Sequence, residues 1–274
     1  MHICIYANCQ GIGVAKLLKV LCGGRIKMEF SVHENYKLIA GTGDLDEFKI
    51  NLRRADLFVY QPIGTSHEWF CTERGGNNLT EELSIDCQSI SIPYVYNNGF
   101  WPYYREGGFH NMQAFREIYD AGGNALDAIQ AYESRKLFFD ILERTRSSFS
   151  ILKEREASTD VKIANYMIDT YRDTQMLFTQ NHPTSTVFGH IASQPLNRLG
   201  VKFDEEWDQI IKGLDANYAG LPGYYPVDYY CLSEGGISYV DRPDAEYKNY
   251  YHGLIYAAFD QWLNESVVDN TKHC

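Results

Sequence analysis

A cysteine at a sharp turn near the start of the chain has the residue type and position for nucleophilic chemistry. Cys9 follows a short apolar run, residues 3–6, and precedes two closely spaced glycines, Gly11 and Gly13. The run is typical of a buried strand, and apolar residues then return at helical spacing. Because a helix N-terminus carries unpaired N–H groups and partial positive charge, a thiol there tends toward the reactive thiolate. The alternative is that Cys9 is a small buried hydrophobe, like Cys4.

A nucleophilic cysteine needs a base, and His182 is the best placed of the eight histidines. It follows residues 175–179 (QMLFT), which are typical of a short strand, and Pro183 then turns the chain away. Strand ends of a parallel sheet meet at one crevice, so His182 and Cys9 can lie together. Asn181 can orient the imidazole, as Asn does in Cys-His-Asn enzymes. The alternative for His182 is a residue that caps the next helix.

The glycines of the turn do not complete a nucleotide-binding motif. Gly11-x-Gly13 is followed by Lys16, where the dinucleotide fingerprint requires Gly or Ala, and the phosphate-loop pattern is absent. His182 and His190 lack the spacing of a helical zinc pair, so we expect no metal. The candidate phosphate ligands are basic residues that are more often solvated surface charges: Lys16, Arg25, Arg53 and Arg54.

Residues 94–111 interleave aromatic side chains with Gly, Asn and Pro. The aromatic rings could stack on a sugar, and the polar neighbours could bind hydroxyls or phosphate. The alternative is a satellite hydrophobic cluster under a long loop. The side chains concerned are Asn97, Asn98, Phe100, Trp101, Tyr103, Tyr104 and Arg105.

Composition restricts the class of protein. The 274 residues carry a net charge of −11, which argues against a general nucleic-acid surface. No apolar run approaches the roughly 20 residues of a membrane span, and the N-terminus lacks the features of a signal peptide. Seven cysteines without CxxC spacing indicate a reducing compartment, so we expect a cytoplasmic protein. The sequence does not indicate an oligomeric state.

Strand and helix patterns alternate along the first two thirds of the chain, which predicts an α/β fold with a mainly parallel sheet flanked by helices. We expect a single domain over residues 1–274, with a core of about 1–200, helical insertions and a Tyr/Gly/Pro-rich extension over about 201–274. The expected strands are 3–6, 25–32, 55–61, 89–96 and 175–179. The expected helices follow the turn as far as Gly23 and then cover about 44–54, 124–142, 159–171, 184–199 and 251–263.

Two fragments, Ala7–Gln10 (ANCQ) and residues 177–184 (LFTQNHPT), resemble the WcbI family of polysaccharide-biosynthesis proteins. Residues 55–63 and 91–104 also fall where that family has a strand ending in Gln and a Pro-containing apolar stretch. The resemblance covers roughly residues 1–200. It implies a fold similar to the SGNH hydrolases, coenzyme A bound near the cysteine, and acetyl transfer to a sugar of a capsular or other surface polysaccharide.

The resemblance also assigns roles to individual residues. It makes Cys9 the nucleophile and His182 its base, with the turn at Asn8, Gln10 and Gly11 holding the oxyanion. The sequence departs from the family at Ala7, where Gly is usual. It departs again before the histidine, where Asn181 replaces an expected carboxylate and leaves the third member of the triad open. For coenzyme A we assign Gly13, Lys16, Arg53 and Arg54, and for the sugar Asn98, Trp101, Tyr103 and Arg105.

The sequence thus predicts an acetyl-CoA-dependent O-acetyltransferase acting on a sugar, with acetyl-CoA as co-substrate. Transfer through an acyl-cysteine and direct transfer, with His182 as base beside Cys9, are both compatible with the residues. Two rival functions remain: an SGNH-like esterase that removes acyl groups, and a non-enzymatic component of a glycan assembly system.

Overall fold

The computed structural model describes residues 1–73, 77–101, 113–203, 207–215, 225–239 and 244–271. The strands are β1 (His2–Ala7), β2 (Glu29–Glu34), β3 (Leu57–Tyr60), β4 (Gln88–Ser91), β5 (Leu177–Thr179) and β6 (His182–Pro183). The helices in the first half of the chain are α1 (Gln10–Cys22), α2 (Asn35–Ile39), α3 (Leu45–Arg53), the 3-10 helices η1 (Thr65–Phe70) and η2 (Leu79–Glu82), α4 (Gln113–Asp120) and α5 (Ala125–Glu133). The remaining helices are α6 (Ile141–Ala157), α7 (Ala164–Thr170), α8 (Ser185–Arg198), α9 (Trp207–Asp215), α10 (Tyr229–Ser233) and α11 (Asp244–Thr271).

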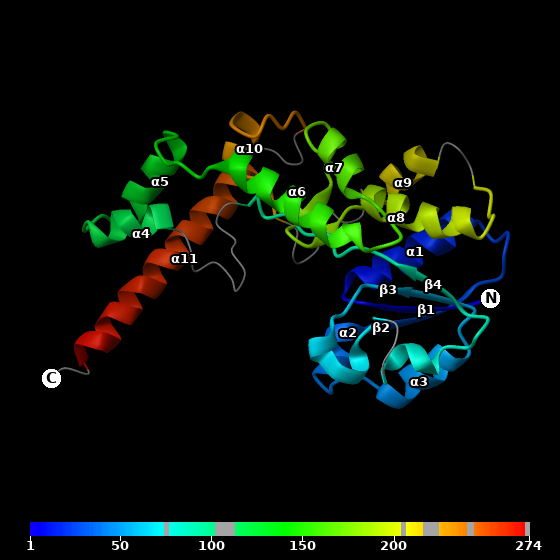
Figure 1. The fold of residues 1–274 in the computed structure, drawn as a ribbon. Coiled ribbons are helices and arrows are strands. Elements are labelled where there is room, and N and C mark those ends of the chain that lie inside the picture. Colours follow the sequence, from blue (N-terminus) through cyan, green and yellow to red (C-terminus); the bar gives the residue numbers. More distant parts are fainter. Residues whose placement is uncertain (74–76, 102–112, 204–206, 216–224, 240–243, 272–274) are drawn as a thin grey trace. The chain divides into compact units, whose positions relative to one another are not determined.

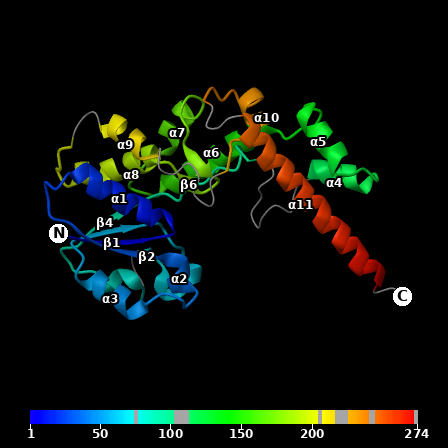
Figure 2. The same ribbon diagram turned by 180° about the vertical axis from the view of Figure 1, so that it is seen from behind.

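A four-stranded parallel sheet in the order β2-β1-β3-β4 forms the centre of the N-terminal part. The central strand β1 is buried along its whole length, as expected for a parallel strand covered on both faces. Helices α1 and α8 cover one face of the sheet, and α2 and α3 lie on the other (Figures 1 and 2). The predicted α/β fold with a parallel sheet flanked by helices is confirmed.

Two glycines allow α1 to pack closely on its neighbours. A Cβ on Gly11 would come within 3.1 Å of the Ala7 side chain, so its absence lets the helix approach the sheet. A Cβ on Gly13 would meet the ring of Phe188 on α8 at 2.4 Å. The two glycines that open α1 therefore serve the packing of this helix, and the predicted coenzyme contact of Gly13 gains no support.

The chain divides into two compact units. The first consists of residues 1–96, 150–170 and 181–222 and contains the parallel sheet, and the second consists of residues 97–149, 171–180 and 223–274. The second unit has an aromatic core, in which the rings of Tyr132 and Tyr230 lie 5.6 Å apart. The expectation of a single domain with a C-terminal extension stays a prediction, as does the likeness to SGNH hydrolases.

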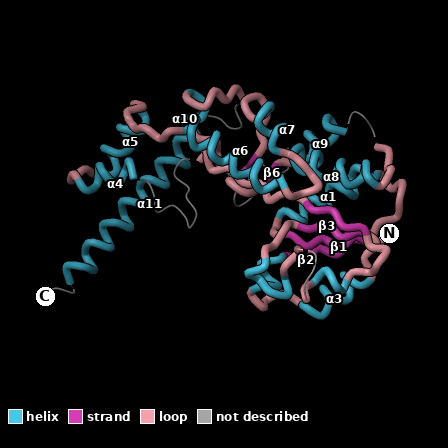
Figure 3. The backbone as a smooth tube through the Cα atoms, in the orientation of Figure 1, coloured by secondary structure: helices cyan, strands magenta, loops and turns pink. Residues whose placement is uncertain are grey.

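Several predicted elements are placed differently (Figure 3). The helix expected over 124–142 ends at Glu133, and a separate helix, α6, begins at Ile141. The predicted helix runs through this break because Phe138 and Phe139 continue the helical spacing of apolar residues. The backbone leaves the helical conformation at Arg135 and Asp140, where φ is positive. Strand β5 pairs with β6 and not with the parallel sheet.

The remaining elements differ from the expected bounds by varying amounts. The helix expected over 159–171 is α7, which begins at Ala164, and the helix expected over 251–263 is part of the longer α11. Strand β4 is shorter than the expected 89–96, and β2 begins four residues later than expected. Helices α3 and α8 lie within one residue of the expected bounds at each end. In the described part of the chain, no helix has both the length and the apolar character needed to cross a membrane.

Candidate functional site

The turn between β1 and α1 is held by the side chain of Asn8. Its Oδ1 accepts a hydrogen bond from the backbone N–H of Gln10 at 2.9 Å, and its carbonyl accepts one from the N–H of Gly11 at 2.9 Å. Cys9 is the N-cap residue of α1 in an αR conformation. The prediction that the amides of Gln10 and Gly11 hold an oxyanion meets an obstacle here, because Asn8 already occupies both N–H groups.

Cys9 and His182 meet although 173 residues separate them in the sequence. The Sγ atom of Cys9 lies 3.8 Å from Nε2 of His182, which is within hydrogen-bonding range for sulfur. Cys9 is half-buried, and His182, on β6, is an exposed residue whose imidazole is partly enclosed by its neighbours. The structure therefore brings together the two residues that the sequence singled out.

The surroundings keep both groups neutral near pH 7. Burial raises the pKa of the Cys9 thiol, the carboxylate of Glu34 raises it further, and the backbone amides of Cys9 and Gln10 offset this only in part. Burial lowers the pKa of His182. This differs from our expectation of a thiolate at the helix N-terminus. The pair is a thiol beside a neutral imidazole, which suits proton transfer during the reaction.

Two buried glutamine side chains lie directly behind the cysteine. The side chain of Gln10 donates from Nε2 to the carbonyls of Val95 at 2.7 Å and Asn181 at 2.8 Å. Gln61, which follows β3, accepts from the N–H of Asn8 at 2.9 Å and donates to Oε1 of Gln10 at 3.1 Å. The side chain of Gln10 thus binds backbone carbonyl groups. Gln61 could have been identified from the sequence because it directly follows a strand.

Glu34 is the carboxylate that the sequence reasoning missed. It ends β2 directly beside Ala7 in the register of the sheet, so it lies at the same edge as Cys9. It accepts from the hydroxyl of Tyr36 at 2.5 Å and forms an ion pair with Lys37. These two partners lower the pKa of Glu34, which therefore carries a negative charge at neutral pH.

Asn181 contacts the site through its backbone, since its carbonyl accepts the hydrogen bond from Gln10. Its predicted role in orienting the imidazole stays a prediction. In the described part of the chain, no group of three or more His, Cys, Asp or Glu side chains is arranged to hold a metal ion.

The predicted phosphate ligands Arg53 and Arg54 are not near Cys9. Arg53 is paired with Glu82 at 2.7 Å, and Arg54 is paired with Glu29 at 3.0 Å. Glu29 begins β2 opposite the start of β1, whereas Cys9 follows the end of β1. Both arginines precede a parallel strand and so lie at the amino edge of the sheet, away from the edge where ligands bind.

Of the other basic candidates, Lys16 lies exposed on α1, two turns from Cys9, where its charge acts on the carboxyl of Asp215. Arg25 donates to the carbonyl of Leu21 at the far end of α1. Lys16 is therefore the predicted phosphate ligand whose position remains compatible with a molecule bound at Cys9.

The aromatic stretch contributes to the core of the second unit. Trp101 is fully buried and donates from Nε1 to the carbonyl of Pro226 at 3.1 Å, and Phe100 packs against it. Asn98 accepts from the hydroxyl of Ser148 at 2.8 Å. The predicted sugar contact by Trp101 is wrong, because a ring with no exposed surface cannot stack on a ligand. Tyr103, Tyr104 and Arg105 lie outside the described residues.

Comparison with known proteins agrees with this architecture. The sequence model of the family described as "Polysaccharide biosynthesis enzyme WcbI" matches residues 2–204. No curated protein matches the chain. A solved structure of WcbI, described as a novel polysaccharide biosynthesis enzyme in its native form without a disulfide bond between CoA and one of its own cysteines, superposes with a TM-score of 0.65. It is 16% identical and covers 95% of this chain and 90% of its own. With three quarters of its length matched by the family model, the chain belongs to the WcbI family of polysaccharide biosynthesis enzymes.

Proposed function

We propose that this protein is an acetyl-CoA-dependent acyltransferase that acetylates a sugar hydroxyl of a surface polysaccharide or its precursor. The observation that carries the proposal is the contact between the Cys9 thiol and the His182 imidazole at the N-terminus of α1. Membership of the WcbI family supports the role in polysaccharide biosynthesis. The solved WcbI structure, whose description names CoA together with a cysteine, supports CoA as the carrier of the acyl group.

In the first half of the reaction, Cys9 attacks the carbonyl carbon of the acyl thioester. His182 accepts the proton of the thiol as the new S–C bond forms, and it then returns this proton to the departing thiol of CoA. The exchange of one thioester for another is nearly thermoneutral. The site therefore accelerates it by positioning the thiol against the thioester and by transferring the proton. A neutral imidazole with a lowered pKa is ready to accept that proton at neutral pH.

In the second half, His182 removes the proton from the acceptor hydroxyl as its oxygen attacks the acyl group on Cys9. The bond to Sγ breaks, and the thiolate of Cys9 takes the proton back from His182. The raised pKa of Cys9 means that the thiol, once re-formed, holds its proton until the next cycle. The same two residues thus serve both half-reactions.

The face of α1 that continues from Cys9 fits the order of groups in an acyl-CoA molecule. Ile12, one turn along the helix, is 58% exposed, and Lys16, one turn further, is also exposed. Residues three to four apart share a helix face, so a thiol, an apolar side chain and a cation follow one another along one line. The pantetheine arm has an apolar portion next to its thiol and ends in phosphates, for which Ile12 and Lys16 provide contacts.

The test combines ligand binding with activity. A ligand that binds the folded state raises the melting temperature, so CoA at millimolar concentration should raise it for the wild type and for Cys9→Ser. Transfer of a labelled acetyl group to a panel of sugars should occur with the wild type and fail with Cys9→Ser. Absence of a thermal shift together with release of acetate from acetylated sugars would contradict the proposal in favour of an esterase. A binding partner captured with neither activity would favour a non-enzymatic role.

A further inference from the structure

We propose that the paired carboxamides of Gln10 and Gln61 are positioning residues that set the geometry between Cys9 and His182. Their role in catalysis rests on the proposed function, whereas the hydrogen bonds that link the two glutamines to each other and to the backbone are observed in the structure. Neither side chain touches the thiol or the imidazole. They act through the two residues that precede these groups, Asn8 and Asn181.

The side chain of Gln10 has every polar position filled. It is 3% exposed, and its two N–H groups point to the carbonyls of Val95 and Asn181. Its oxygen accepts from the N–H of Val95 at 3.2 Å and from Nε2 of Gln61 at 3.1 Å. A carboxamide offers two donors and an oxygen with two lone pairs. Only one orientation of this amide satisfies all four partners, so the partners fix it.

Gln61 extends this connection to the other side of the cysteine. It is 4% exposed, and its Oε1 accepts from the backbone N–H of Asn8 at 2.9 Å. Its own backbone N–H donates to the carbonyl of Tyr6, which ties it to the last part of β1. The remaining N–H of its side chain faces the carbonyl of Pro93 at 3.4 Å.

The result is a continuous chain of hydrogen bonds from one reactive residue to the other. It runs from the N–H of Asn8 through Gln61 and Gln10 to the carbonyl of Asn181. Cys9 comes directly after the first end and His182 directly after the second. The two segments are far apart in the sequence, and a shift of about 1 Å between reacting groups can reduce a rate by 10²-fold. Buried amides that join these two backbones therefore hold the distance on which the reaction depends.

The role is tested by the reactivity of Cys9 in the full-length protein, without CoA or a sugar. We would measure the rate at which iodoacetamide alkylates Cys9 at pH 7, following the peptide that contains Cys9 by mass spectrometry, in Gln10→Met, His182→Ala and the double variant. Gln61→Met is a second variant, which keeps all of Gln10 in case Gln10→Met fails to fold. Gln194→Met is the matched control, because this glutamine also donates to two backbone carbonyls in the same unit, those of Lys162 and His190.

We expect His182→Ala and Gln10→Met each to slow alkylation by at least about tenfold, and the double variant to be no slower than His182→Ala. Gln61→Met should behave like Gln10→Met, while Gln194→Met should match the wild type. The proposal would be overturned if the double variant slowed alkylation by the product of the two single effects, or if the glutamine variants reacted at the wild-type rate. If the expected coupling is found but the wild type transfers no acetyl group, the positioning role stands and the proposed function fails.

Discussion

The two edges of the parallel sheet differ in the polar residues that they hold. At the amino edge, Arg54 pairs with Glu29, and Asp56 accepts from the backbone N–H of His2 at 2.6 Å. At the carboxyl edge, the residues behind the turn are uncharged amides, and in front of them a neutral thiol faces a neutral imidazole. At the amino edge the charged groups are paired with each other. The carboxyl edge also has an ion pair, Glu34 with Lys37, but beside it the thiol and the imidazole are kept neutral next to buried amides.

This difference shows where chemistry can occur on the sheet. Solvent-exposed ion pairs contribute little energy and leave no group ready to exchange a proton. A protonated thiol beside a neutral imidazole has a proton to give and a base to receive it, and the transfer takes place as the sulfur forms its new bond. Burying the side-chain amides of Gln10 and Gln61 at the carboxyl edge costs free energy, and their hydrogen bonds offset this cost.

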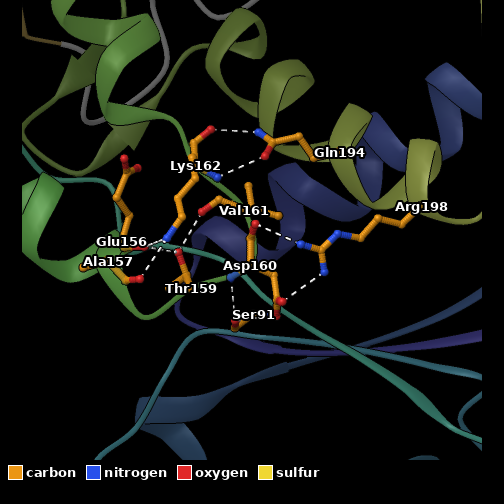
Figure 4. A network of polar contacts seen from close by, with 9 residues as sticks. All are labelled: Ser91, Glu156, Ala157, Thr159, Asp160, Val161, Lys162, Gln194 and Arg198. Atoms are coloured by element: carbon orange, nitrogen blue, oxygen red, sulfur yellow. Dashed lines mark hydrogen bonds and ion pairs between the residues drawn. The ribbon is translucent and has the colours of Figure 1, made fainter.

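A third polar network lies within the same unit, at the carboxyl end of β4. Asp160 accepts from both the N–H and the hydroxyl of Ser91, at 2.8 and 2.7 Å, and from Arg198 at 3.0 Å (Figure 4). Through these contacts Asp160 connects the segment before α7 to the end of β4 and to α8. Its partners lower the pKa of Asp160, so this network resembles the amino edge, where charges are paired for structure.

The largest effect is expected when the imidazole at the carboxyl edge is removed. We expect His182→Ala to lower kcat for acetyl transfer by about 10²–10⁴-fold, because the thiol of Cys9 then has no base. In the wild type, kcat/KM should fall with acidity only below pH 6.5, the usual pKa of histidine, because burial lowers the pKa of His182. A pH profile of both proteins checks this. An acidic limb that persists unchanged in His182→Ala would assign it to another group.

A smaller effect is expected when α1 is forced away from α8. Gly13→Ala places a Cβ where the ring of Phe188 now lies, and such overpacking typically costs about 1–3 kcal/mol. The free energy of unfolding from urea titration checks this. In the background of Phe188→Ala the same change should cost much less, since the ring is gone. An equal cost in both backgrounds would mean that the ring is not the cause.

The smallest effect is expected at the amino edge. Arg54→Ala removes the pair with Glu29, which is exposed, so we expect a loss of at most about 1 kcal/mol in the free energy of unfolding. Binding of CoA and kcat should remain as in the wild type. A marked rise in KM for acetyl-CoA would restore Arg54 as a phosphate ligand and would erase the distinction between the two edges.

The sequence was most informative where local rules determine the structure. The strand, turn and helix around Cys9 follow from an apolar run, an Asn and a helical repeat within eighteen residues. His182 was found from its proline and from the preceding apolar run, although its strand does not join the parallel sheet. The expectation that strand ends meet at one crevice paired the two residues across 173 positions, and the family resemblance then assigned them the roles of nucleophile and base.

Other assignments failed for identifiable physical reasons. Arg53 and Arg54 precede a strand, and the direction of a parallel strand alone places such residues at the amino edge. Gln61 follows the same strand, so the same rule pointed to it. Trp101 differs: an aromatic ring among Asn, Gly and Pro looks the same in sequence whether it stacks on a sugar or fills a core. The carbonyl that accepts its hydrogen bond belongs to Pro226, which is 125 residues away in the sequence.

Whether Cys9 carries the acyl group is measured most directly by the intact mass of the protein mixed with acetyl-CoA in the absence of a sugar. If Cys9 is the acyl carrier, the protein gains the mass of one acetyl group, which is located on the peptide that contains Cys9 and is released when the acceptor is added. Cys9→Ser should show no thioester of this kind, and His182→Ala should form it far more slowly. Full acetyl transfer by Cys9→Ala, or transfer by the wild type with no acylated Cys9 at any time point, would show that Cys9 does not carry the acyl group.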